Sequence, residues 1–327
     1  MQSIQSLQEL MAAQIEKEAG LIGATEPVNL YQPIEYTLNM GGKRIRPVMT
    51  LMACDMFGGK IENAVNLALA IEIFHNFTLI HDDIMDKADI RRNNPTVHKK
   101  YNENIAILAG DAMAGLAYKY LFRVQSEKTD QIITLFNQTN LQIYEGQQYD
   151  MDFEERLNVP IKEYIHMIRL KTAVLIACSL KGGALAANAS EEDADHLYEF
   201  GINLGLAFQL RDDLLDVFAD QKKFGKKTGG DIVANKKTFL LIKAMELATP
   251  GQQEKLGNWI SQTEFNPEEK IEAIKKIYIE TGVKQVTEET MDLFFRKALH
   301  AMDAIRIQEE RKKELLLLAG QIMKREQ

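Results

Sequence analysis

The spacing of the prolines most restricts the folds that this chain can adopt. No proline falls between Pro95 and Pro160 or between Pro160 and Pro250, so long helices can run through both intervals without a breaker. Signals for β-structure are weak, with few alternating apolar runs and no Asn-Gly or Asp-Gly hairpin turn between them. The sequence also contains no evident repeat, low-complexity tract or linker. We therefore expect an all-α fold in a single domain that spans residues 1–327.

Apolar periodicity locates the expected helices. Residues 61–81, IENAVNLALAIEIFHNFTLIH, are apolar around most of the helix circumference, which is typical of a helix buried inside a bundle. Further helical patterns cover 103–125, 130–152, 161–180 and 192–218, and a last amphipathic stretch with a leucine-rich end covers 283–324. Glycine-rich, asparagine-rich or basic segments predict loops at 41–43, 91–96 and 222–231.

Charge and hydropathy narrow the class of ligand. Hydrophobic residues make up 46% of the chain, and its formal net charge is −8. Such a chain repels nucleic acid and anionic lipid in general, so an anionic substrate needs local Lys and Arg clusters or metal ions. No uninterrupted apolar run approaches the ~20 residues of a membrane helix, and the N-terminus lacks the pattern of a secretory signal. We expect a soluble, cytoplasmic protein without an integral membrane segment.

Two aspartate clusters carry the chemistry, DDIMD at 82–86 and DDLLD at 212–216. The first and last aspartates of each cluster share one helical face, where like charges cost about 0.2–0.5 kcal/mol per pair. Each cluster follows an apolar segment, which adds a desolvation cost, so the charges require a cationic partner. Mg²⁺ prefers oxygen ligands and typically takes one or two carboxylates together with substrate phosphates. The clusters therefore predict magnesium sites.

Basic residues gather near both aspartate clusters. GGKRIRP at 41–47 precedes the first cluster and the Arg91–Arg92 pair follows it, while six lysines follow the second cluster between 222 and 237. The glycines in these segments allow the backbone to approach a ligand closely. Acidic pairs and basic loops on one chain suggest a diphosphate that is bridged to the protein through metal.

Eight motifs in order resemble the trans-isoprenyl diphosphate synthases, also called polyprenyl synthetases, over nearly the whole chain. They are GGKRIRP, IEIFHNFTLIHDDIMDKADIRR, NPTVH, AILAGDA, EGQQYDMDFEE, MIRLKTAVLIACSLKGG, GLAFQLRDDLLD and FGKKTGGDIVANKKT. The resemblance implies the isoprenoid synthase fold, a large helical bundle around a central active-site cavity. It also implies a homodimer and Mg²⁺-dependent, head-to-tail trans condensation of isopentenyl diphosphate with an allylic diphosphate.

The same resemblance assigns roles to individual residues. For metal binding it implies Asp82, Asp86 and Asp212, with Asp83 and Asp216 nearby. For the allylic diphosphate and the reacting carbons it implies Arg91, Lys171, Lys226, Lys236, Thr172, Phe208 and Gln209. For the diphosphate of isopentenyl diphosphate it implies Lys43, Arg46, His75 and Arg92. The expected catalytic set is Asp82, Asp83, Asp86, Lys171, Asp212 and Lys226. From its spacing alone, His75 reads as a core histidine, and the motif match reverses that interpretation.

One departure from the family pattern falls in the loop after the arginine pair. The family commonly has glycine there, and this chain has Asn93. Asparagine tolerates unusual φ angles better than most residues, so we expect the loop to keep its function.

Two phenylalanines bear on product length. Phe77 and Phe74 precede Asp82 by five and eight residues, which places them roughly 7 and 12 Å below the metal site on a helix. An aromatic at the fifth position resembles archaeal-type geranylgeranyl diphosphate synthases, so we expect these rings to stop chain growth; ordinary core packing is the alternative. Farnesyl or longer products remain open, as do a subunit of a heteromeric prenyl synthase and a terpene cyclase or squalene-type synthase.

Overall fold

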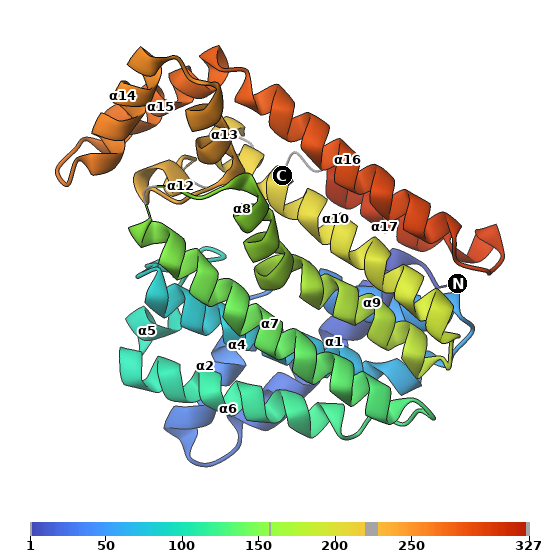
Figure 1. Ribbon diagram of the computed structural model, residues 1–327. Helices are drawn as coiled ribbons and strands as arrows, with labels where there is room; N and C mark the ends of the chain where they lie inside the picture. The colour runs from blue at the N-terminus through green and yellow to red at the C-terminus, as the bar shows by residue number, and fades with distance from the viewer. Residues whose placement is uncertain (1, 157, 220–227, 325–327) are drawn as a thin grey trace. The chain divides into compact units, whose positions relative to one another are not determined.

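The computed structural model describes residues 2–156, 158–219 and 228–324, and Figure 1 shows their arrangement in helices. The N-terminal part contains α1 (Ile4–Gly23), α2 (Val28–Asn39), α3 (Ile45–Met56), α4 (Ile61–Met85), β1 (Ile90–Arg91), β2 (Asn94–Pro95), α5 (Val97–Lys100), α6 (Glu103–Leu121) and α7 (Thr129–Glu155). There follow α8 (Ile161–Ile168), the π-helical turn η1 (Arg169–Ala173), α9 (Val174–Ala186), α10 (Glu191–Phe218), α12 (Gly230–Val233) and α13 (Phe239–Leu247). The chain continues with α14 (Pro250–Ser261), α15 (Pro267–Glu280), α16 (Val283–Asp303), the 3₁₀ turn η2 (Glu309–Arg311) and α17 (Lys313–Lys324).

The expected all-α fold is confirmed, with three local differences. The predicted loop at 91–96 overlaps an antiparallel hairpin of two strands with two residues each, in which Ile90 pairs with Pro95. The predicted helix at 161–180 is interrupted by the π-helical turn η1, and the stretch 283–324 divides into α16, η2 and α17. Of the predicted basic loop at 222–231, residues 222–227 lie outside the described residues.

The chain forms two compact units, which are described separately. Unit 1 comprises Met1–Asn137, Cys178–Leu197 and Arg306–Leu316. Unit 2 comprises Gln138–Ala177, Tyr198–Ile305 and Leu317–Gln327. That the whole chain acts as one domain stays a prediction.

Helix α4 is the centre of unit 1. It packs against α3 and α6, while α1 packs against α2 and α3. Its sequence is apolar on all sides, and it is the one helix in the described part of the chain that is long and apolar enough to cross a membrane. Because 67% of its most apolar window is buried within the protein, α4 has the character of a core helix. Its C-terminus carries the first aspartate cluster.

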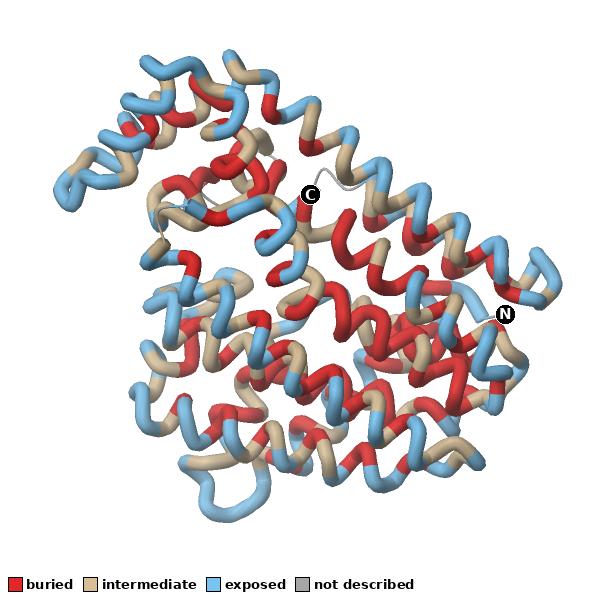
Figure 2. The backbone as a smooth tube through the Cα atoms, viewed as in Figure 1, coloured by how far each residue is buried: buried red, intermediate tan, exposed pale blue. Residues whose placement is uncertain are grey.

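Unit 2 combines a helical core with a close helix pair. The core includes Leu214, Leu240, Leu256 and Ile274, and Figure 2 shows buried and exposed residues alternating along the amphipathic helix α16 that borders it. In the pair formed by η1–α9 and α10, a side chain at Gly205 would lie 2.6 Å from the Cα atom of Ala173. A side chain at Gly201 would similarly lie 2.5 Å from the Cα atom of Ala177. The two backbones therefore approach each other where only glycine fits.

Candidate active site

The first aspartate cluster lies at the end of α4. Asp82 is half-buried in the last turn, Asp86 caps the helix and is exposed, and Asp83 is buried. The Arg91 Nε atom donates to both carboxylate oxygens of Asp83 at 2.8 Å. Burial raises the pKa of Asp83, and the hydrogen bonds from Arg91 oppose that rise. Because Arg91 already neutralises Asp83, Asp82 and Asp86 are the stronger candidates for a metal ion.

The hairpin after this cluster links it to the glycine-rich loop. Arg92 and Asn93 form its turn, with φ angles of 51° and 61°. Asn93 thus adopts the left-handed conformation that a glycine would supply, which asparagine tolerates better than most residues. The Arg92 guanidinium donates to the carbonyl oxygen of Gly41. Adjacent arginines therefore contact the aspartate cluster on one side and the glycine-rich loop on the other.

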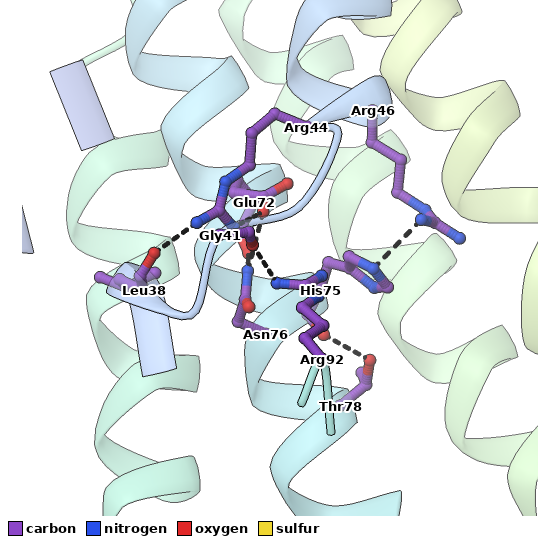
Figure 3. Close-up of polar contacts among 9 residues, drawn as sticks. All are labelled: Leu38, Gly41, Arg44, Arg46, Glu72, His75, Asn76, Thr78 and Arg92. Atoms are coloured by element: carbon purple, nitrogen blue, oxygen red, sulfur yellow. Dashed lines mark hydrogen bonds and ion pairs between the residues drawn. The ribbon is translucent and has the colours of Figure 1, made fainter. Parts of the chain in front are cut away.

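A buried ion pair holds the same loop from within. Arg44 lies at the N-cap of α3 in a left-handed conformation, with φ of 46°. Its guanidinium donates to the carbonyl oxygen of Leu38 and to the carboxylate of Glu72 on α4 (Figure 3). The Asn76 side chain also donates to Glu72, at 2.9 Å. The Arg44 and Glu72 side chains are only 8% and 3% exposed, so solvent screens this pair little.

His75 lies on α4, like Glu72, and faces Arg46 on α3 (Figure 3). The Arg46 Nη1 atom lies 3.1 Å from the His75 Nε2 atom. Burial lowers the pKa of His75 well below its usual value, and the nearby guanidinium groups of Arg46 and Arg92 lower it further. Because a guanidinium has only donors, the neutral imidazole accepts this hydrogen bond through Nε2. His75 therefore orients the Arg46 side chain without adding a charge.

An aromatic cluster lies below the first aspartate motif in unit 1. The Phe74 ring centroid is 5.2 Å from that of Phe77 and 5.5 Å from that of Phe136. The Phe77 ring also meets His81 edge to face at 4.8 Å. Both predicted phenylalanines are buried, and Phe77 is the nearer of the two to Asp82 along α4. Their role in limiting chain length stays a prediction.

In unit 2, the π-helical turn η1 displays Lys171 and Thr172. A side chain at Gly146 of α7 would lie 2.4 Å from the Lys171 backbone nitrogen, so this glycine lets α7 approach the turn. One turn further along α7, the Asp150 carboxylate accepts a hydrogen bond from Lys171 Nζ at 2.6 Å. Single π turns occur frequently at functional sites, where they re-aim side chains. Here the turn and Asp150 together fix the direction of the Lys171 ammonium group.

A chain of hydrogen bonds runs from η1 to α8 in unit 2. The Thr172 hydroxyl donates to Gln209 Oε1 at 3.0 Å, and Gln209 Nε2 donates to Asp213 Oδ1 at 3.1 Å. The hydroxyl of the buried Tyr164 donates to the other oxygen of Asp213. Burial raises the pKa of Asp213 to about 8, with a further rise from Asp231 that the two hydrogen bonds oppose. This network ties Thr172 and Gln209 to the second aspartate cluster.

The three aspartates of the second cluster differ in environment. Asp213 is buried in the network above, and Asp216 accepts from the backbone nitrogen of Asp231 at 3.1 Å. Asp216 thus supports the segment that begins α12. Asp212 is exposed. Among the three, Asp212 is therefore the best placed to reach a metal ion.

A cavity of about 190 Å³ in unit 2 collects most of the residues predicted there. Its lining includes Lys171, Thr172, Gln209 and Lys236, together with Asp150 and Asp213. Phe208 is half-buried on α10 and is not among the lining residues, and Lys226 lies outside the described residues. A larger cavity of about 550 Å³ between α13 and α14 contains none of the residues expected to bind diphosphate.

Sequence reasoning missed three side chains that the structure makes prominent. Glu72 is a charged residue within the apolar stretch Leu67–Phe74 of α4, and a charge in such a stretch is a signal that the sequence offers. Asp150 lies in the middle of the EGQQYDMDFEE motif, whose only signal in the sequence is its resemblance to the family. Tyr164 gave no local signal, because its contact with Asp213 joins residues 49 positions apart.

The carboxylates suit magnesium better than a metal with an all-protein ligand set. Throughout residues 2–156, 158–219 and 228–324, no three His, Cys, Asp or Glu side chains form a group that could hold a metal ion by themselves. Mg²⁺ usually binds one or two carboxylates and completes its shell with water and phosphate oxygens. Asp82 and Asp86 at the end of α4, and the exposed Asp212, fit that requirement.

Comparison with known proteins places the chain among relatives. The sequence profile of the Polyprenyl synthetase family matches residues 27–278. Geranylgeranyl diphosphate synthase of Methanosarcina mazei is 42% identical over 228 residues, which cover 69% of this chain and 70% of that protein. Geranylfarnesyl diphosphate synthase of Aeropyrum pernix is 36% identical over 298 residues, which cover 89% of this chain and 92% of that protein.

The fold agrees with that of a solved relative. A crystal structure of a geranylgeranyl pyrophosphate synthase, 42% identical in sequence, superposes with a TM-score of 0.93 and covers 99% of both chains. The profile match extends from α2 to α15 and includes both aspartate clusters and the basic loop between α2 and α3. This chain belongs to the polyprenyl synthetase family.

Proposed function

We propose that this protein is a trans-prenyltransferase that condenses isopentenyl diphosphate with allylic diphosphates and releases geranylgeranyl diphosphate. One observation carries the proposal: adjacent arginines in one hairpin contact Asp83 of the first aspartate cluster and Gly41 of the basic loop. An allylic diphosphate needs metal-binding carboxylates, and isopentenyl diphosphate needs cations. The hairpin keeps the aspartate cluster and the basic loop in a fixed position relative to each other.

The two substrates draw on different residues. Isopentenyl diphosphate is held by Lys43, Arg46 and Arg92, with neutral His75 orienting Arg46. The allylic diphosphate is held by Arg91, Lys171, Lys236 and Lys226, while Thr172, Phe208 and Gln209 face the reacting carbons. The support for the second set is the cavity in unit 2, which Lys171, Thr172, Gln209 and Lys236 line together.

The reaction proceeds by ionisation, condensation and elimination. The cationic side chains stabilise charge on the departing diphosphate, and the double bond of isopentenyl diphosphate attacks the allylic carbon. Loss of a proton, for which the departed diphosphate is a suitable acceptor, regenerates a double bond. Apolar residues such as Phe77 exclude water, which would otherwise capture the cation as an alcohol.

Mg²⁺ is the proposed cofactor, with Asp82, Asp86 and Asp212 as its ligands and Asp83 and Asp216 as supporting residues. When bound, the ion supplies Lewis-acid stabilisation of the diphosphate oxygens. Asp83 orients Arg91, and Asp216 anchors the backbone at residues 229–231.

Product length rests on Phe77 and Phe74. Both rings are buried in an aromatic cluster, so a growing chain that reaches them meets a rigid surface. This supports a twenty-carbon product, and the archaeal relatives named geranylgeranyl diphosphate synthases agree with it. A twenty-five-carbon product is the second candidate, because a relative that aligns over 298 residues is named geranylfarnesyl diphosphate synthase.

One assay tests these proposals. The purified protein is incubated with isopentenyl diphosphate, each allylic primer and Mg²⁺, and the dephosphorylated products are sized by reversed-phase chromatography beside an EDTA control. Geranylgeraniol that disappears with EDTA is the expected result. No elongation by the protein alone would indicate a subunit of a heteromeric synthase, and cyclic or phosphate-free products would indicate a cyclase.

A cytoplasmic homodimer is the proposed state of the protein. Exposed apolar residues on α6 and at its C-cap, namely Ile107, Leu108 and Phe122, supply a surface that a second copy can cover. Light scattering after size-exclusion chromatography tests this, with about twice the 37.1 kDa chain mass expected. The cytoplasmic location accords with the buried character of α4 and is tested by fractionation of the native host.

A further inference from the structure

Arg44 is the basic residue of the GGKRIRP segment that the proposed reaction leaves without a role. It differs from Arg46, which faces His75, because its guanidinium reaches back to the carbonyl oxygen of Leu38, near the C-terminus of α2. The same guanidinium donates to Glu72 in the middle of α4. One side chain therefore ties the end of α2, the start of α3 and the core helix together (Figure 3).

The surroundings of Glu72 favour its pairing with Arg44. Its carboxylate is buried, and it also accepts a hydrogen bond from Asn76 one turn later on α4. The Asn76 amide donates to the Glu72 backbone carbonyl at 2.8 Å as well, so the side chain that orients Glu72 is itself fixed. A buried carboxylate is unfavourable unless it is paired, which makes the Arg44 position strongly preferred.

The backbone conformation of the glycine-rich loop before α3 depends on the Arg44–Glu72 ion pair. Arg44 holds a left-handed φ of 46°, which costs energy for a residue with a side chain, and Gly42, two residues earlier, has a φ of 118°. Such a conformation persists only when surrounding contacts impose it. The Arg44–Glu72 pair supplies the contacts on one side, and the hydrogen bond from Arg92 to Gly41 supplies one on the other.

Charge balance gives Glu72 a second effect. The GGKRIRP segment that Glu72 contacts contains Lys43, Arg44 and Arg46. It also lies close to Arg92, so this region is strongly cationic. The negative charge of Glu72 favours the charged form of Arg92 and neutralises Arg44. Without Glu72, Arg44 would be a buried, unpaired cation that repels the neighbouring cations, and the loop would move.

We infer that Arg44 and Glu72 are positioning residues that set the spacing of Lys43 and Arg46 for the diphosphate of isopentenyl diphosphate. This inference rests on the proposed function. Neither residue touches the substrate; the ion pair acts by fixing the loop that does. Loss of a group that orients metal ligands typically weakens metal binding by about 10–100-fold, and we expect an effect near the lower end of that range for these cationic groups.

The test is Glu72→Gln, which keeps the size of the side chain and removes its charge. Isopentenyl diphosphate is titrated calorimetrically in EDTA without an allylic substrate, so that metal and turnover do not contribute. We expect its Kd to rise about tenfold, while kcat at saturating isopentenyl diphosphate and KM for the allylic substrate change less than about twofold. An unchanged Kd, or an equal loss for both substrates, overturns the inference.

Glu18→Gln is the matched control. It also neutralises a half-buried carboxylate of unit 1, one that accepts a hydrogen bond from Tyr120 on another helix. Stability is expected to fall while the Kd for isopentenyl diphosphate stays unchanged. If Glu72→Gln does not fold, Arg44→Lys carries the test, because lysine keeps the charge but lacks the fork that reaches both Leu38 and Glu72.

Limited trypsinolysis separates this inference from the proposed function. Lys43 is exposed, and we expect cleavage of the Lys43–Arg44 bond, followed by mass spectrometry, to be several-fold faster in Glu72→Gln. If the wild-type protein neither binds nor elongates isopentenyl diphosphate, the proposed function fails and cleavage alone decides whether Glu72 holds the loop. Equal cleavage rates in the variant and the wild type overturn the inference in either case.

Discussion

The contact between Lys171 and Asp150 leads to the sharpest prediction. The two side chains are 22% and 19% exposed and their charged atoms lie 2.6 Å apart, so solvent weakens the pair only modestly. Asp150→Asn keeps an oxygen acceptor at nearly the same place and removes its charge. We expect the Lys171 ammonium to lose orientation while the fold is retained.

The size of the effect follows from hydrogen-bond energetics. A hydrogen bond to a charged group contributes about 1.5–3 kcal/mol, and a neutral one contributes about 1 kcal/mol. The substitution therefore loses about 0.5–2 kcal/mol of Lys171 positioning. Since about 1.4 kcal/mol corresponds to a factor of ten, kcat/KM for the allylic substrate should fall about 2–30-fold.

The assay measures steady-state elongation at varied farnesyl diphosphate, together with the Kd for isopentenyl diphosphate, which should not change. Asp152→Asn on the same helix is the control, because its exposed carboxylate contacts Gln148 and does not line the cavity. A rise in kcat/KM for Asp150→Asn would refute the reasoning. It would mean that Asp150 competes with the diphosphate for Lys171 instead of aiming it.

Three further predictions concern the limit on product length, the metal ion and the dependence of stability on pH. Phe77→Ala removes the ring nearest the first aspartate cluster, and we expect products longer than twenty carbons on reversed-phase chromatography. The free energy of unfolding should fall by about 3–5 kcal/mol. An unchanged product profile would show that other residues limit product length. Asp82→Asn should reduce elongation at least ~100-fold while the Kd for isopentenyl diphosphate in EDTA is kept, and a parallel loss of that binding would argue against a metal role. The pKa of His75 lies well below its unfolded value near 6.5, so the unfolded chain takes up a proton first as pH falls. The free energy of unfolding should therefore decrease below pH ~6.5 by at most about 1.4 kcal/mol per pH unit from this group, and urea titrations at pH 7.5 and 5.5 should show a smaller decrease for His75→Gln; equal decreases would contradict it.

Features encoded in local sequence were predictable. The long apolar segment at 61–81 became the core helix α4, because a helix that is apolar on every side has to be buried. Asn93 took the left-handed turn position because its short polar side chain tolerates that conformation. The glycine-rich loop before α3 also appeared where its sequence placed it.

Features that arise from packing could not be predicted. The π-helical turn at Lys171 depends on the approach of α7 at Gly146, and no periodicity within 161–180 signals one extra residue in the turn. The partners of the individual aspartates were hidden for the same reason. Asp83 belongs to the predicted metal set, and the sequence gives no sign that its carboxylate accepts hydrogen bonds from Arg91. The contact of Asp213 with Tyr164 is equally invisible in the sequence.

The glycine contacts between η1–α9 and α10 have a consequence for motion. Helices that touch through their backbones at Gly201 and Gly205 cannot slide or rotate past one another without a clash. Their amides should therefore be among the slowest in unit 2 to exchange with deuterium, and substrate should change their exchange rates least. Thr172 and Gln209 should therefore lie on a rigid helix pair, and we expect any conformational change of unit 2 during turnover to occur in its other segments.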